Sequence, residues 1–283
     1  MTSKNELRRP TIPTRTEDQS VASPTTPASA AVVAIGNELL SGKVRDENLT
    51  YLAAELRPLG VDLRLALVVG DEPAEIADAI HYASARAEIV ITTGGVGPTH
   101  DDVTLAAVAQ AFDLPLEPVP SLVEAIKTHY GEKTNEALLS MALAPRGVEL
   151  IQPVPFFLPV FKVKQVYVFP GDPSALKLLF NGWKHELAGV PYEIARLEFD
   201  LEEGDLAGHL EAICAAHPAV SVGSYPRFDP GRPYKVLVTI ECKDTSQVRA
   251  AAGDLATRIT RDFGAERLLG QSGPGEQAPA PRR

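Results

Sequence analysis

Cysteine is scarce in this sequence. Among 283 residues only Cys214 and Cys242 carry a thiol, and they do not form a C-x-x-C pair. Two cysteines at this spacing exclude a disulfide framework and give no indication of a zinc site. Both lie within apolar patterns, so we expect them to be small core residues.

Long apolar runs and an excess of basic charge are missing as well. No stretch reaches the roughly 18 consecutive apolar residues that a transmembrane helix needs, and the N-terminus shows no signal peptide. The 27 Lys and Arg residues are outnumbered by 37 Asp and Glu residues, which gives a net charge of −10. We therefore expect a cytoplasmic protein that binds neither membranes nor nucleic acid, since both present anionic surfaces.

What the chain does contain is enough apolar sequence for a sizeable core, 45% of its residues. Residues 1–30 are rich in Ser, Thr and Pro and are predicted to be a disordered tail. Residues 271–283 return to Gly, Pro, Gln and Arg and are predicted to be a second loose tail. The segment Gly189-Val190-Pro191 divides the remainder into domains at 31–188 and 189–270.

The first domain has the pattern of an α/β fold. Buried strands are predicted at the apolar runs 31–36 and 89–91. Two more strands are predicted at 61–67, where apolar and other residues alternate, and at 163–169. Segments with helical spacing follow them, which predicts three layers, a mostly parallel sheet with helices on both faces. Asn48 and Asp71 are expected to cap two of these helices, and residues 113–147 are expected to be helical. The second domain has the order β-α-β-β-α, typical of a small α+β domain.

The most informative stretch follows the strand at 89–91. It contains Gly94, Gly95 and Gly97, then Pro98, and a helical pattern that we expect to start at Thr99. Glycines let the backbone approach a ligand closely, and free N–H groups at a helix start favour an anion. The loop is neither a P-loop nor a dinucleotide fingerprint, because its glycines fit neither spacing.

Acidic side chains surround this loop. Asp101 and Asp102 lie where a phosphate would approach, and Thr99 with Asp102 has the spacing of a capping box. Like charges would repel a phosphate unless a cation bridges them, and carboxylates with substrate phosphates are the usual ligands of Mg²⁺. The alternative is that both aspartates only complement the helix dipole.

Parallel strands bring further carboxylates to the same place. Ligands of such sheets bind beyond the carboxyl ends of the strands, and three of these ends carry Glu38, Asp71 and the Gly94–Asp102 loop. A second strand–turn–helix junction, Pro170–Ser174, is either another anion-binding helix start or an ordinary Asp cap with proline at the first helical position.

These motifs resemble those of a known family. The stretch Thr93–Thr104 resembles the signature of the molybdopterin-binding domain of molybdenum-cofactor biosynthesis proteins. The segments Gly36–Gly42, Asp46–Asn48 and Phe169–Ser174 narrow the resemblance to the N-terminal domain of competence/damage-inducible protein A and the corresponding domain of eukaryotic-type FAD synthase.

The resemblance implies a pocket shared by the glycine loop and the loops after the first two strands. It implies catalytic and metal-binding roles for Glu38, Asp71 and Asp102. The ligand-binding residues that it implies are Asp46, Asn48, Thr93, Gly94, Gly95, Gly97, Pro98, Thr99, Gly171 and Ser174.

The activity implied is metal-dependent hydrolysis of a nucleotide pyrophosphate such as ADP-ribose or FAD, with Mg²⁺ or Co²⁺ as cofactor, by a homo-oligomer. Two alternatives stay open: a protein that binds a pterin or nucleotide without turnover, and molybdopterin adenylyl transfer. Two departures from the bacterial pattern favour the FAD-synthase-type branch. Residues 152–161 lack an Asn-x-x-Gly-x-Ala-Pro-Gly segment, and Ala175 stands in place of a glutamate.

Overall fold

The computed structural model describes residues 28–228 and 233–275. Most of the two predicted tails lies outside these residues. Ser29 and Ala30 belong to the first strand, and the last strand ends at Ser272. Both predicted tails therefore extend about two residues too far into the fold.

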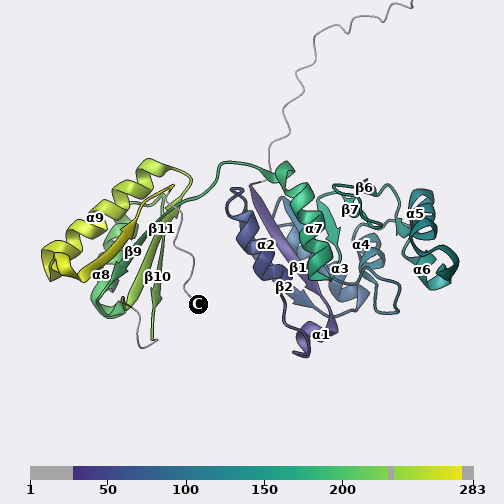
Figure 1. Ribbon diagram of the computed structural model, residues 1–283, viewed down its shortest axis with the longest axis horizontal. Helices are drawn as coiled ribbons and strands as arrows, with labels where there is room; N and C mark the ends of the chain where they lie inside the picture. The colour runs from purple at the N-terminus through teal and green to yellow at the C-terminus, as the bar shows by residue number, and fades with distance from the viewer. Residues whose placement is uncertain (1–27, 229–232, 276–283) are drawn as a thin grey trace, which may run out of the picture.

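The first domain has the three layers that its sequence pattern predicts (Figure 1). Its sheet has the order β2-β1-β3-β8-β7-β6. Strands β2, β1, β3 and β8 are parallel, β7 is antiparallel to β8, and β6 is antiparallel to β7. The strands are β1 Ser29–Ile35, β2 Asp62–Val69, β3 Ile89–Thr93, β6 Glu149–Ile151, β7 Val160–Val163 and β8 Val166–Phe169. The helices that cover it are α2 Asn48–Leu56 and α7 Pro173–Trp183 on one face, and α3 Pro73–Ser84 and α4 Thr104–Ala111 on the other.

The central strands are apolar on both faces because helices cover both. Every residue of β1 is buried. Ala30 and Val32 pack towards α2 and α7, whereas Ala31 and Val33 pack towards α3 and α4, as the two-residue period of a strand requires.

Two predictions for the first domain were wrong in part. Residues 113–147 contain the helices α5 (Pro120–Tyr130) and α6 (Glu136–Ser140), but these are flanked by paired strands, β4 Leu116–Pro118 and β5 Leu143–Pro145. A single strand was expected at 163–169. The chain instead forms a hairpin there, because it turns between β7 and β8 at Lys164, whose φ is 53°. The short elements that remain are α1 Asn37–Leu40 and 3₁₀ turns at Gly131–Lys133 and Lys184–Leu187.

The second domain is an antiparallel sheet with two helices on one face. Its elements are β9 Glu193–Phe199, α8 Glu203–Ala216, β10 Ser221–Pro226, β11 Val236–Cys242, α9 Thr245–Phe263, a 3₁₀ turn Ala265–Arg267 and β12 Leu268–Ser272. The predicted order β-α-β-β-α is confirmed, and β12 adds an edge strand to give β10-β11-β9-β12. Sequence reasoning missed β12 because only two of its five residues are large and apolar. Cys242 is buried as expected, but Cys214 is exposed.

Polar contacts join the two domains at the C-terminal end of α2. Arg57 forms an ion pair with Glu241, and its guanidinium lies 3.5 Å from the ring centroid of Tyr192. Lys243 Nζ donates to the carbonyl oxygen of Gly60 at 2.6 Å. Helix α2, which begins beside the loops of the first domain, therefore ends in contact with the second domain.

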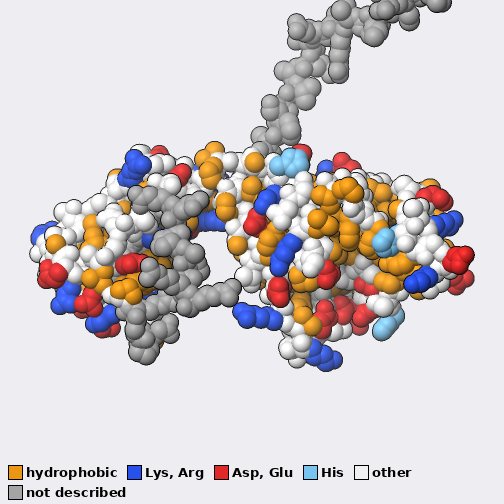
Figure 2. Space-filling view, in the orientation of Figure 1, with side chains coloured by type: hydrophobic (Ala, Val, Ile, Leu, Met, Phe, Trp, Pro, Cys, Tyr) orange, Lys and Arg blue, Asp and Glu red, His pale blue; other side chains and the backbone are white. Residues whose placement is uncertain are grey.

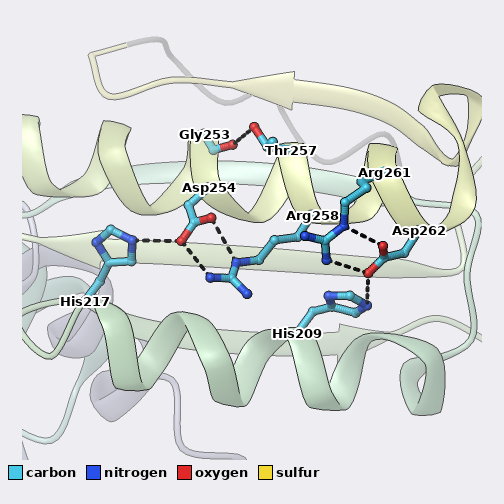
Figure 3. A network of polar contacts seen from close by, with 8 residues as sticks. All are labelled: His209, His217, Gly253, Asp254, Thr257, Arg258, Arg261 and Asp262. Carbon is cyan, nitrogen blue, oxygen red and sulfur yellow. Dashed lines mark hydrogen bonds and ion pairs between the residues drawn. The ribbon is translucent and has the colours of Figure 1, made fainter.

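Two histidines of the second domain face carboxylates of α9 (Figure 3). His217 lies 3.3 Å from Asp254, and His209 lies 3.7 Å from Asp262. Arg258 also bonds Asp254 at 2.9 Å. Each histidine thus contacts a carboxylate of α9, and these contacts connect α8 and the residue after it with α9.

The ionisation of Asp254 makes the stability of this domain depend on pH in the acid range. The hydrogen bond from Arg258, and next the contact with His217, hold the pKa of Asp254 below its ordinary 3.8. The ionised carboxylate therefore stabilises the fold above that value, and this stability is lost as the pH falls through the lower folded pKa. We expect Asp254→Asn to lower Tm at pH 7 and to flatten the loss of Tm below about pH 4. Calorimetry of both proteins from pH 7 to pH 2 checks this, and parallel curves would contradict it.

None of the helices in the described part of the chain combines the length and the hydropathy of a membrane span.

Candidate functional site

The carboxyl ends of four neighbouring strands meet at one edge of the first sheet. Two hydrogen bonds show how close the segments that follow them lie: Gly36 N donates to Val69 O at 3.0 Å, and Gly94 N donates to Phe169 O at 3.3 Å. The loops after β1, β2, β3 and β8 therefore lie side by side, which is the arrangement that the strand pattern predicts.

Thr104, which is fully buried, holds the glycine loop by two hydrogen bonds. Its Oγ1 donates to Gly94 O at 2.7 Å, and its N–H donates to Gly95 O at 3.1 Å. These bonds fix the loop at the point where α4 begins. The helix start expected at Thr99 is therefore wrong by one and a half turns.

Asp102 closes a turn ahead of that helix. Its Oδ2 accepts hydrogen bonds from the N–H of Thr99 at 2.8 Å and from the Thr99 hydroxyl at 2.5 Å. The residue that precedes α4 is Val103, and it has no side-chain cap. Asp102 is half-buried, whereas Asp101 is exposed.

One pocket of about 70 Å³ lies beside this loop, and we call it the carboxylate pocket. Its lining residues are Ile35, Glu38, Leu39, Val44, Arg45, Asp46, Glu47, Asn48, Thr93, Gly94, Gly171 and Pro173. Asp46 caps α2 here, because its Oδ1 accepts from Asn48 N at 2.9 Å and from Leu49 N at 3.1 Å. Its other oxygen, Oδ2, is buried without a hydrogen-bond partner among the described residues.

Asn48 does not cap α2, so that prediction was wrong. Its side chain is only 6% exposed, and its Nδ2 donates to Thr93 Oγ1 and to Gly171 O, each at 2.8 Å. Its Oδ1 is buried without a partner in the part of the chain that the structure describes. Two unpaired acceptor oxygens, one from Asp46 and one from Asn48, therefore belong to residues that line one pocket. Buried acceptors are normally satisfied, so the pocket favours a hydrogen-bond donor or a cation.

The hydrogen bonds of Asn48 connect α2 with the segments that contain Thr93 and Gly171. A substitution of Asn48 therefore tests whether these bonds stabilise the pocket. We expect Asn48→Ala to cost about 1–3 kcal/mol, because Thr93 Oγ1 and Gly171 O lose a buried donor. Urea unfolding of the full chain measures the change. A loss below a few tenths of a kcal/mol would show that these bonds contribute nothing.

A second pocket lies on the other side of the glycine loop, with a volume of about 150 Å³. We call it the apolar pocket; its lining residues are Gly95, Val96, Gly97, Asp102, Leu105, Ala106, Leu116, Ser140, Met141 and Leu143. Gly94 lines the carboxylate pocket and Gly95 lines the apolar one. One loop thus separates a small acidic pocket from a larger apolar pocket.

The three residues expected to share a metal ion are not gathered at one point. Glu38 lines the carboxylate pocket and Asp102 the apolar pocket. Asp71 lines neither, and its Oδ2 accepts from Asn37 N at 2.9 Å instead of capping α3, which begins after Glu72. Among the described residues, no three His, Cys, Asp or Glu side chains form a group that could hold a metal ion.

The junction at 170–174 is an Asp cap. Asp172 Oδ1 accepts from Ala175 N at 2.8 Å, and Pro173 occupies the first helical position. This arrangement confirms the capping interpretation, while Gly171 and Pro173 still line the carboxylate pocket. Ser174 follows in the first turn of α7 and lines neither pocket.

Sequence reasoning missed some lining residues. Arg45 lines the carboxylate pocket, and its position beside Asp46 was an available signal. Leu116, Met141 and Leu143 line the apolar pocket, and no local pattern marks them, because the pairing of β4 with β5 brings them together.

The unusual segment 152–161, which consists of a loop and the first two residues of β7, lies outside both pockets. Gln152 Nε2 donates to the carbonyl oxygens of Val154 and Phe156, each at 2.8 Å. Phe157 stacks on His129 with ring centroids 4.3 Å apart. None of the residues in this segment lines either pocket.

Fold and loop geometry define an α/β domain with two pockets beside the glycine loop, and comparison with known proteins identifies its family. Residues 31–188 match the model described as "Probable molybdopterin binding domain", and residues 191–265 match "FAD synthase, middle domain". The chain belongs to the molybdopterin-binding domain family.

The relatives of this chain include a protein named as an FAD synthase and a protein named as CinA-like. A "Probable FAD synthase" of Caenorhabditis briggsae is 30% identical over 252 residues, covering 78% of this chain and 48% of that protein. A "CinA-like protein" of Synechococcus sp. (strain CC9902) is 33% identical over 213 residues, covering 67% of this chain and 49% of that protein. The chain thus spans about half the length of these two relatives. The crystal structure of the protein CinA from Thermoplasma acidophilum is similar with a TM-score of 0.54 and 27% identity, covering 58% of this chain and 99% of that one.

Proposed function

We propose that the first domain hydrolyses a nucleotide pyrophosphate of the ADP-ribose or FAD type, with Mg²⁺ or Co²⁺ held in the carboxylate pocket. The observation that carries the proposal is the unpaired, buried Oδ2 of Asp46. A buried carboxylate oxygen without a donor is costly, and a cation removes that cost. Figure 2 shows Asp and Glu side chains gathered on this part of the first domain, near α1.

The residues present fit such a cation. Mg²⁺ is commonly held by one or two carboxylates together with substrate phosphates, and Glu38 and Asp46 supply two carboxylates to one pocket. The unpaired Oδ1 of Asn48 adds a neutral oxygen. A divalent cation bound there would neutralise the diphosphate and activate water. Asp71 and Asp102 are not needed as ligands in this proposal.

The chain's other groups bind and orient the substrate. Arg45 lines the carboxylate pocket and would hold a phosphate, because its guanidinium offers several N–H donors. The apolar pocket, with Leu105 and Met141, would take the ring system, because ligand rings bind among apolar side chains with a few polar groups that fix their orientation.

Asp102 supplies that polar group in the apolar pocket, where we propose that it accepts an N–H of the ring. We expect Asp102→Asn to lower kcat/KM by about 10- to 100-fold, because a charge-assisted hydrogen bond contributes about 1.5–3 kcal/mol. The turn at Thr99 should persist, since an amide oxygen also accepts. Asp101→Asn is the matched control and should change kcat/KM by less than about threefold, because it alters only an exposed charge near a helix start. Steady-state kinetics and Tm of both variants decide between substrate binding and a purely structural role.

The activity itself is tested by incubating the full chain with ADP-ribose and, separately, with FAD, each with Mg²⁺, with Co²⁺ and with chelator alone. Cation-dependent release of AMP is the expected result. Tight binding of either compound without AMP would overturn hydrolysis and leave a nucleotide-binding protein. Sedimentation of the same sample tests the proposal that the chain is a homo-oligomer.

A further inference from the structure

The second domain has a groove that neither the fold nor the proposed activity uses. It lies between α8 and β10 and has a volume of about 510 Å³. Its lining residues are Glu203, Ala207, Leu210, Glu211, Cys214, Val222 and Ser224. Ala207, Leu210 and Val222 make its base apolar, and a groove of this size is large enough for several side chains of a partner.

One wall of the groove is an unpaired sheet edge. β10 is the terminal strand of its sheet, paired only with β11 among the described residues. Arg227 N donates to Lys235 O across that pair. Because the backbone groups of an antiparallel strand alternate in direction, Val222 and Ser224 direct their N–H and C=O groups away from β11. Such an edge pairs readily with another extended chain.

Two carboxylates lie along the other wall. Glu203 and Glu211 both belong to α8 and both line the groove, and no Lys or Arg does. Ser224 Oγ donates to Glu203 Oε1 at 2.8 Å, which ties the first carboxylate to the sheet edge. The groove is therefore apolar at its base and negative along one side.

This charge pattern argues against a second copy of the chain as the occupant. Pairing of two β10 strands about a two-fold axis would bring Glu203 and Glu211 of both copies along one seam. Like charges at such positions are destabilising.

We propose that this groove binds an extended segment of a partner protein, added to β10 as a fifth strand and carrying the sequence pattern basic-x-apolar-x-basic. Glu203 and Glu211 are eight residues apart on one helix, which is about 12 Å. A strand covers about 13 Å in four residues, so basic residues at i and i+4 match the two carboxylates. The residue at i+2 lies on the same face of the strand and fills the apolar base between them.

A synthetic peptide tests the pattern on the full chain. The probe is acetyl-Thr-Lys-Thr-Val-Thr-Lys-Thr-amide. We expect it to shift the amide NMR signals of Val222 and Ser224 and to slow alkylation of Cys214 at least fivefold at saturation. Cys214 reports on the groove because it is exposed and lines it, whereas Cys242, at 8% exposure, is buried.

Two peptides and one variant serve as controls. Replacing both Lys residues of the probe by Glu, or moving Val by one position to the opposite face, should abolish both effects. The double variant Glu203→Gln/Glu211→Gln should weaken binding of the Lys peptide at least tenfold. The amide that replaces the Glu203 carboxylate keeps an acceptor for the Ser224 hydroxyl, so the wall of the groove should persist.

Three results would overturn the proposal. The first is no shift at Val222 and Ser224 up to millimolar peptide. The second is an equal response to the Lys and Glu peptides. The third is a self-associated chain whose Val222 and Ser224 amides are already protected, which would make a second copy the occupant.

Discussion

Replacing Asp46 by Asn is expected to lower turnover at least about 100-fold, since even residues that only support metal ligands typically cost 10- to 100-fold when mutated. The amide keeps one oxygen, which can still accept from the N–H groups of Asn48 and Leu49 that Oδ1 accepts from now. Asn caps a helix as well as Asp does, so the fold and Tm should change little. What is lost is the charge and the second acceptor, Oδ2, which is the atom without a partner.

The adjacent residue Glu47 provides a matched control. It also lines the carboxylate pocket, but it is exposed and pairs with Lys177 at 3.5 Å. Glu47→Gln removes one negative charge from the same segment and should leave turnover within about threefold, because exposed ion pairs contribute little. If Asp46→Asn retained wild-type turnover, or if both variants lost it equally, the carboxylate pocket would not be the cation site.

Gly94→Ala is expected to cause the largest loss of stability, roughly 3–5 kcal/mol from a steric overlap and a strained backbone together. A Cβ at Gly94 would lie 2.1 Å from the carbonyl oxygen of Ile35, and the φ of Gly94 is +106°. The oxygen belongs to β1, which is buried at the centre of the sheet and has no room to move. The loop must therefore shift, and both pockets with it.

Gly42→Ala separates the two contributions. Gly42 has a φ of +71°, and a Cβ there would have no atom within 4 Å. Only the backbone strain remains, and it should cost about 1–2 kcal/mol. Urea unfolding of both variants measures the difference, and equal losses would show that the contact with Ile35 is unimportant.

The parts of the fold that the sequence predicts are those determined by local pattern. The apolar runs of β1 and β3 follow from neighbouring residues, and their parallel pairing follows from the alternation of strands with helices. The Asp172 cap with Pro173 was one of the two alternatives that the local sequence allowed. The crowding of loops at one sheet edge follows in turn from parallel strands.

The errors concern side chains with more than one available partner. Asn48 could cap α2, but Asp46 takes that role, and Thr93 and Gly171 bind the Asn48 amide from distant segments. Asp71 accepts from Asn37 rather than from its own helix. Capping rules consider only hydrogen-bond partners that are near in the sequence. They do not include a partner that comes near only when the sheet has folded.

The start of α4 and the apolar pocket were beyond sequence reasoning for the same reason. The helix begins at Thr104 because its hydroxyl and N–H are fixed by Gly94 and Gly95. The wall formed by Leu116 and Leu143 exists only because β4 pairs with β5. Proline-flanked strands of three residues carry too little pattern to be predicted.

We propose above that a divalent cation binds in the carboxylate pocket together with a nucleotide pyrophosphate. Calorimetric titration of Co²⁺ into the full chain, with the slowly hydrolysed methylene analogue of ADP-ribose present, measures this without relying on turnover. We expect binding of Co²⁺ that is lost in Asp46→Asn and retained in Asp102→Asn, because Asp46 and Glu38 line that pocket and Asp102 lines the other. Binding that survives Asp46→Asn and disappears in Asp102→Asn would contradict it and place the cation on the other side of the glycine loop.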